Sequence, residues 1–155
     1  MTEKYRKNVG IVVCKNKKVL LCSRADQDND CWQFPQGGID NGESVLDAAK
    51  RELFEETGIK NIKLIKEMPF SVKYDFPKKN QNAYYSQYVG QEQFWVLFEF
   101  MNNGDDEIKF DINPKCIEFK KYKWDNIETA VRDIVEFKKE AYKKVVKYFK
   151  PFVED

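Results

Sequence analysis

The sequence contains no histidine. This absence excludes Ser-His-Asp and Cys-His nucleophilic sites, zinc sites with imidazole ligands and any histidine general base. An enzyme with this sequence must therefore perform its acid–base chemistry with carboxylates, lysine, tyrosine or a metal-bound water.

The sequence also lacks any C-x-x-C pair and any run of 18 apolar residues. Without such a run it has no candidate membrane-spanning helix, and "MTEKYRKN" lacks the apolar core of a signal peptide. Of the four cysteines, Cys14, Cys22, Cys31 and Cys116, two lie within apolar runs, which is typical of buried free thiols in a reducing compartment. We therefore expect a soluble, cytoplasmic protein.

An excess of either charge is absent as well. The 27 basic and 26 acidic residues leave a formal net charge of +1, so a nucleic acid or membrane could be recognised only through a local patch. With 155 residues, 42% of them hydrophobic, the chain can bury a core of normal size. We expect one globular domain over residues 1–155, monomeric, without a membrane or DNA partner.

Strand-like and helix-like patterns are mixed along the chain. Ser44 begins a capping box and Gly58 is a typical helix stop, so "SVLDAAKRELFEETG" is predicted to be a helix, and residues 126–149 a second one. A loop rich in lysine and tyrosine, residues 76–91, is long enough to suggest a functional role. These patterns predict helices packed on a sheet, an α/β or α+β fold. The expected strands are 9–14 and 18–23 as a hairpin, 61–68, 93–100 and 117–124, with 31–36 extended and 37–44 a glycine-rich loop.

Three glutamates crowd one face of the first predicted helix. Glu52, Glu55 and Glu56 stand at i, i+3 and i+4, where like charges cost a helix about 0.2–0.5 kcal/mol per pair. Arg51 can reach Glu55 at i+4 and neutralise one of the three charges. The spacing alone is compatible with a solvated glutamate-rich surface or with a cation site.

The glycine-rich loop before this helix favours the cation site. Gly37, Gly38 and Gly42 permit close backbone approach to a ligand where the chain enters the helix. Carboxylate clusters select hard cations such as Mg²⁺ or Mn²⁺, which share the phosphates of a substrate. From spacing alone, the two features together leave a metal-phosphate site and a solvated glutamate-rich surface evenly balanced.

The segment "GGIDNGESVLDAAKRELFEETGI" resembles the Nudix box, G-x5-E-x7-R-E-U-x-E-E-x-G-U with U aliphatic. The resemblance implies an α/β/α sandwich with a mixed sheet, and metal-dependent hydrolysis of a nucleoside diphosphate linked to another moiety. It also implies Mg²⁺ or Mn²⁺, as more than one ion. All nine fixed positions are filled, by Gly37, Glu43, Arg51, Glu52, Leu53, Glu55, Glu56, Gly58 and Ile59.

The same resemblance assigns roles to residues. Glu52, Glu55 and Glu56 are implied as metal ligands with catalytic roles, one of them also serving as the base, and Gly37 is implied as part of the metal site. Glu118 is implied as an additional ligand from outside the box. The structural positions of the box are Gly37, Glu43, Arg51 and Gly58.

Similarity beyond the box narrows the substrate. "YRKNVGIVVC", "WQFPQGGI", "YDFPKK", "GQEQFW", "EFKKYKW" and "EFKKEAYKKVVKYF" together resemble the bacterial RNA 5′-pyrophosphohydrolase branch, which is related to diadenosine polyphosphate hydrolases. The resemblance implies conversion of a 5′-triphosphate RNA end to a monophosphate. By this resemblance the 5′-terminal nucleotides are held by Arg6, Trp32, Phe137 and Lys138, and Gln91 and Gln93 lie near the phosphates.

Two alternatives to an RNA substrate remain. A dinucleoside polyphosphate hydrolase would need the same metals and two nucleoside pockets. A non-catalytic Nudix-fold binding module should have lost box carboxylates, which are intact here.

Two residues implied in RNA binding also permit structural roles. Lys138 falls within the apolar stripe of the last predicted helix, formed by Ile134, Ala141, Val145 and Tyr148. It either snorkels to solvent or lines a pocket with Phe137. Trp32 is either a core residue or a stacking platform beside the glycine-rich loop.

Overall fold

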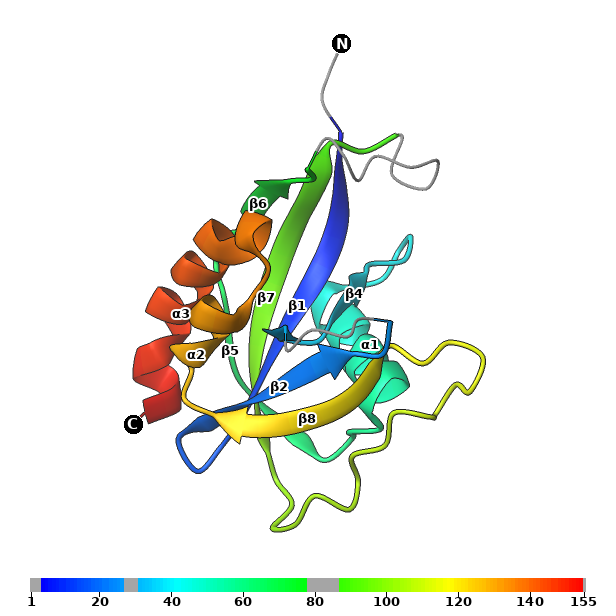
Figure 1. Ribbon diagram of the computed structural model, residues 1–155, viewed down its shortest axis with the longest axis vertical. Helices are drawn as coiled ribbons and strands as arrows, with labels where there is room; N and C mark the ends of the chain where they lie inside the picture. Colours follow the sequence, from blue (N-terminus) through cyan, green and yellow to red (C-terminus); the bar gives the residue numbers. More distant parts are fainter. Residues whose placement is uncertain (1–3, 27–30, 78–86, 155) are drawn as a thin grey trace.

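A mixed β-sheet lies between helices in the computed structural model, which describes residues 4–26, 31–77 and 87–154 (Figure 1). Helix α1 (Val45–Thr57) covers one face of the sheet, and α2 (Thr129–Asp133) and α3 (Lys139–Glu154) cover the other. The chain therefore has the α/β/α arrangement that the Nudix resemblance implies.

The first two strands form the predicted hairpin. Strand β1 (Tyr5–Lys15) pairs antiparallel with β2 (Lys18–Arg24). The two turn residues, Asn16 and Lys17, have φ angles of 52° and 66°, which is the left-handed pair that a two-residue hairpin turn requires.

Strand β1 also pairs with β7 (Gly90–Phe100), and this is the parallel pair that makes the sheet mixed. The other pairings are antiparallel. Within the described residues the sheet has eight strands, and two of them, β4 (Gln36–Gly38) and β6 (Val72–Asp75), are strands that the sequence did not predict. The remaining strands are β3 (Trp32–Gln33), β4 (Gln36–Gly38), β5 (Ile62–Glu67), β6 (Val72–Asp75) and β8 (Phe119–Asp125).

The start of the glycine-rich segment differs from the prediction. Gly37 and Gly38 belong to β4 and pair with Val9 and Asn8 of β1, so they are strand residues rather than loop. Pairing with β1, a central strand of the sheet, holds this segment in contact with α1. The expected loop therefore begins only after Gly38.

Helix α1 forms as its sequence signals predict. The Ser44 side chain accepts a hydrogen bond from the Asp47 backbone N–H at 3.1 Å, and Gly58 ends the helix at φ 77°. Ala49 and Leu53 are fully buried against the sheet. This packing fixes the helix face that carries the box glutamates.

The predicted helix over 126–149 is wrong as a single element. Helix α2 ends at Asp133, Ile134 and Val135 are extended with ψ angles of 154° and 145°, and a 3-10 turn (Glu136–Lys138) leads into α3. Ile134, at this break, has its side chain buried in the core. The apolar stripe that joined Ile134 to Ala141 therefore does not lie on one helix, and Lys138 lies at the corner between the two helices.

The cysteines are free thiols, with Cys14 and Cys22 buried. None of the described helices is long and apolar enough to cross a membrane. The predicted loop at 76–91 lies largely outside the described residues, which omit 78–86.

Candidate active site

Arg51 connects the glycine-rich segment to helix α1. Its guanidinium group donates to both carboxylate oxygens of Glu43, at 2.8 and 2.9 Å, and to the Gly38 carbonyl at 3.0 Å. It also donates to Glu52 at 2.8 Å and to Glu55 at 3.3 Å. The hydrogen bonds from Arg51 lower the pKa of Glu43 to about 2. Arg51 thus offsets much of the charge crowding, and its hydrogen bonds to Glu43 and Glu52 are shorter than its hydrogen bond to Glu55.

Glu52 packs directly over Gly37. A Cβ atom at position 37 would stand 2.1 Å from the Glu52 carboxyl carbon, far inside ordinary contact distance. Glycine is therefore required here because the Glu52 carboxyl group occupies the space of a side chain. The same arrangement recurs at Gly38, whose Cβ would meet the Arg6 guanidinium at 2.3 Å.

Three carboxylates from two parts of the chain line one cavity of about 460 Å³, the carboxylate cavity. Glu52 and Glu56 belong to α1, and Glu118 is the residue directly before β8. The guanidinium groups of Arg6 and Arg24 line the same cavity, and Arg24 lies 3.8 Å from the Glu118 carboxylate. The cavity therefore offers oxygen ligands beside cationic groups suited to phosphate.

Glu56 is the most buried of these carboxylates, with 8% of its surface exposed. Burial, followed by the charges of Glu52 and Glu118, raises its pKa well above the ordinary value, and burial also raises the pKa of Glu52. The Glu56 Oε2 atom is buried without a hydrogen-bond partner. A buried, unpartnered carboxylate oxygen beside a second carboxylate fits a hard cation, which would supply the missing partner. Among the described residues, no three acidic or cysteine side chains already form a complete ligand set.

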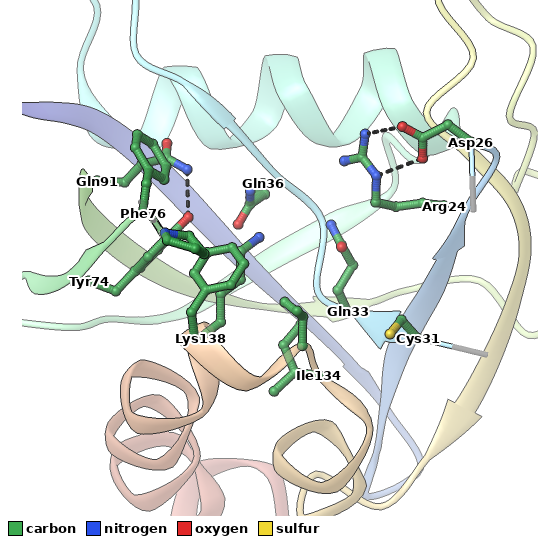
Figure 2. Close-up of a pocket in the computed structure, with 13 residues that line it drawn as sticks. Arg24, Asp26, Cys31, Gln33, Gln36, Tyr74, Phe76, Gln91, Ile134 and Lys138 are labelled. Atoms are coloured by element: carbon green, nitrogen blue, oxygen red, sulfur yellow. Dashed lines mark hydrogen bonds and ion pairs between the residues drawn. The ribbon is translucent and has the colours of Figure 1, made fainter. Parts of the chain in front are cut away.

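A second cavity of about 310 Å³, the lysine cavity, lies at the corner between α2 and α3 (Figure 2). It is lined by Lys138, Phe137 and Tyr74. Lys138 is only 8% exposed, and its ammonium nitrogen lies 5.7 Å from the Tyr74 ring centre and 5.9 Å from that of Phe137. Burial, with a smaller effect from Arg24, lowers the pKa of Lys138 to about 8. The side chain faces a cavity, so it does not simply extend to solvent.

The two cavities adjoin, because both are lined by Arg24, Gln33, Gln36 and Gln91. Figure 2 shows these four side chains between the Lys138 corner and helix α1. Carboxylates therefore lie at one end of a continuous site, and a lysine with aromatic rings lies at the other.

The two predicted glutamines differ in position. Gln91 lines both cavities and donates to the Tyr74 hydroxyl at 2.5 Å. Gln93 is fully buried, donates to Asn8 and Gln36 at 2.9 Å each, and lines neither cavity. Gln91 can therefore contact a ligand directly, whereas Gln93 acts through Gln36.

Two other predicted residues lie apart from the cavities. Trp32 lines neither cavity, and the ammonium groups of Lys121 and Lys123 lie 5.3 and 4.6 Å from its ring centre. The Glu55 side chain is 50% exposed, pairs with Arg51 and also lines neither cavity. Arg6, Phe137 and Lys138, in contrast, are brought to the site.

Sequence reasoning missed Arg24, which lines both cavities. It donates to Asp26 at 2.9 and 3.0 Å and lies close to Glu118. The available signal was an arginine at the end of an apolar strand, which many surface strands share.

Known proteins resemble this chain over nearly its whole length. A family model described as NUDIX domain matches residues 4–146, a stretch that contains all the site residues above. An RNA pyrophosphohydrolase of Pelagibacter ubique is 44% identical over 142 residues, covering 90% of this chain and 88% of its own. An RNA pyrophosphohydrolase of Bartonella bacilliformis is 40% identical, covering 96% and 94%. The solved structure of the E. coli dihydroneopterin triphosphate pyrophosphohydrolase has a TM-score of 0.67 and 21% identity, covering 94% and 99%, a likeness of fold.

Proposed function

The chain belongs to the Nudix family, and from that premise we propose that it is a metal-dependent RNA 5′-pyrophosphohydrolase. It converts the 5′-triphosphate end of an RNA to a 5′-monophosphate and releases pyrophosphate or successive phosphates. The observation that carries this proposal is the adjoining pair of cavities, with carboxylates at one end and Lys138 with aromatic rings at the other. Relatives named RNA pyrophosphohydrolase at 40% and 44% identity support it.

The proposed cation site lies at the carboxylates. We propose Glu52, Glu56 and Glu118, which line the carboxylate cavity, as ligands of Mg²⁺ or Mn²⁺, with Gly37 of the same cavity as a further oxygen donor. Glu55 lies outside the cavity and would have to turn away from Arg51 to join them as a ligand. Such cations neutralise and orient the polyphosphate and lower the pKa of a bound water. More than one ion fits the number of carboxylates.

The remaining side chains position the substrate and move one proton. Arg6 and Arg24 bind phosphate oxygens, while Lys138 and the rings of Phe137 and Tyr74 hold a 5′-terminal nucleotide. Water oxygen attacks a phosphorus atom, the anhydride bond to the leaving phosphate breaks, and a carboxylate of Glu52 or Glu56 takes the proton of the water. A carboxylate can fill this role in a chain without histidine.

A dinucleoside polyphosphate hydrolase is the second candidate, because it would use the same cations. It would also need a second nucleoside pocket. Phe119 is the aromatic residue in the wall of the carboxylate cavity, and with 2% exposure it offers no free ring face to a second base. This burial favours a substrate with one nucleotide end in the lysine cavity. A non-catalytic module is disfavoured by the intact box.

The test compares the wild-type protein with Glu56→Gln in Mg²⁺ or Mn²⁺, with triphosphate-ended RNA and diadenosine tetraphosphate as parallel substrates. We expect the wild-type protein to produce 5′-monophosphate RNA, and Glu56→Gln to be inactive on both substrates. Activity that survives Glu56→Gln would contradict the metal assignment. Much faster turnover of the dinucleotide would contradict the RNA assignment.

A further inference from the structure

Gln36 lies at the boundary between the two cavities and has contacts toward both. Its side chain lines the carboxylate cavity and the lysine cavity. Its backbone N–H interacts with the Glu56 carboxyl group and partly opposes the rise in the pKa of that group. Figure 2 places the Gln36 side chain between Gln91 and Gln33, above the Lys138 corner. A polyphosphate that runs from the carboxylates to a nucleotide in the lysine cavity must pass this side chain.

The orientation of the Gln36 amide is set by a buried neighbour. Gln93 is 0% exposed and uses its Nε2 group to donate to the Asn8 and Gln36 side-chain oxygens, at 2.9 Å each. Because the Gln36 carbonyl oxygen accepts from Gln93, the Gln36 NH₂ group must point away from Gln93. In this orientation the Gln93 Oε1 atom is buried without a hydrogen-bond partner. The opposite orientation would place the Gln93 NH₂ group there instead, and a buried NH₂ group without an acceptor costs more than a buried carbonyl without a donor.

None of the residues that the structure describes accepts a hydrogen bond from the Gln36 NH₂ group. The side-chain oxygen of Gln36 accepts from Gln93, and Gln36 is only partly buried. Toward the Glu56 carboxyl group, Gln36 acts through its backbone. The side-chain donor is therefore directed into the space between the cavities.

We propose that Gln36 is a phosphate-binding residue, whose NH₂ group donates to a non-bridging oxygen of the 5′-polyphosphate, and that Gln93 is the positioning residue that orients it. The proposal deepens the RNA 5′-pyrophosphohydrolase function and rests on it. A neutral amide suits this position, because it contacts the anion without forming an ion pair with the nearby carboxylates. The residue binds the charged part of the substrate and leaves the base to the lysine cavity.

The experiment measures binding separately from catalysis. Gln36→Met keeps a side chain of similar length and removes the donor, and Asn126→Met is the matched amide-to-methionine control at the turn before α2, where the Asn126 backbone carbonyl accepts from Thr129. For each protein, Kd is measured with Mg²⁺ for a short RNA that carries a non-hydrolysable methylene-bridged 5′-triphosphate and for the same RNA with a 5′-hydroxyl end. Thermal unfolding of each variant reports whether it is folded.

The expected result is specific to the phosphate end. Gln36→Met should raise Kd for the triphosphate analogue about 10- to 100-fold, as expected for a lost hydrogen bond to a charged group, and leave Kd for the 5′-hydroxyl RNA unchanged. Gln93→Met should weaken the triphosphate analogue in the same direction by a smaller factor, and Asn126→Met should change neither value.

Three results would contradict the proposal or the function on which it rests. An unchanged Kd for the triphosphate analogue in Gln36→Met would overturn the proposal. An equal loss for both RNAs would also overturn it, because it would place Gln36 in the nucleotide pocket instead. A wild-type protein that binds both RNAs equally would contradict the RNA 5′-pyrophosphohydrolase function itself, which distinguishes that failure from the failure of Gln36.

Discussion

Replacing Gly37 by alanine tests whether the position of the Glu52 carboxyl group determines activity. The added Cβ would stand 2.1 Å from the Glu52 carboxyl carbon and 2.2 Å from its Oε2 atom. Ordinary contact begins at 3.4 Å, so the carboxyl group must withdraw by about 1.3 Å. A displacement of about 1 Å in a reacting group costs on the order of 100-fold in rate, so kcat/KM for triphosphate RNA should fall about 100-fold, or about 2.7 kcal/mol.

Stability should change much less than activity in this variant. The clashing atoms belong to the end of a flexible side chain that borders a cavity, so Glu52 can move without disturbing the core. We expect a loss below about 1 kcal/mol, which for a chain of this size lowers Tm by roughly 2–4 °C. Activity assays and thermal unfolding of the same preparation separate the two effects.

Two glycine controls separate the clash from backbone strain. Gly104→Ala adds a methyl group with no atom within 4 Å and no positive φ, so activity and Tm should both be unchanged. Gly42→Ala meets no atom either, but its φ of 80° costs about 1–2 kcal/mol with a side chain, so Tm should fall while kcat/KM holds. Wild-type kcat/KM in folded Gly37→Ala would refute the reasoning, and so would a loss in Gly104→Ala as large as that in Gly37→Ala.

Two further predictions concern titratable groups. Because the pKa of Glu56 is raised in the folded, metal-free protein, ionisation of this group destabilises the fold as pH rises above the ordinary value of 4.5. In chelator at pH 8, Glu56→Gln should therefore have a higher Tm than the wild-type protein. With metal present, its activity should fall at least about 100-fold. A lower Tm at pH 8 would contradict the burial argument. Because the pKa of Lys138 is lowered to about 8, kcat/KM for RNA should decline as pH rises through 8, and Lys138→Met should be about 10-fold less active at pH 7 without that decline. An identical pH profile in Lys138→Met would show that the lysine does not contact the substrate.

Local signals in the sequence were sufficient for helix α1 and for the hairpin. The Ser44 cap, the Gly58 stop and the apolar spacing between them act within a few residues of one another, so tertiary contacts did not need to be known. The position of Glu118, in contrast, came from family resemblance. Only the pairing of β8 with β2 brings it to the same cavity as Glu56, and no local pattern encodes that pairing.

The lysine cavity was the part that sequence reasoning described least well. The apolar period continues from Ile134 through Ala141, and the same spacing suits one helix or two elements joined by an extended pair. The chain adopts two elements, with Ile134 buried in the core at the break between them. This burial is a tertiary contact that the local sequence does not reveal. Arg24 was missed for a similar reason, since its role depends on the contacts that place it between two cavities.

A competition experiment tests the central claim most directly. Equimolar triphosphate-ended RNA and diadenosine tetraphosphate are offered to the wild-type protein in one Mg²⁺ reaction, and both products are followed over time, so the ratio of rates gives the ratio of the two kcat/KM values. With the lysine cavity as the nucleotide site and Phe119 buried, the RNA should be consumed at least about 10-fold faster and yield 5′-monophosphate ends. A ratio in favour of the dinucleotide, or no 5′-monophosphate RNA, would contradict the account.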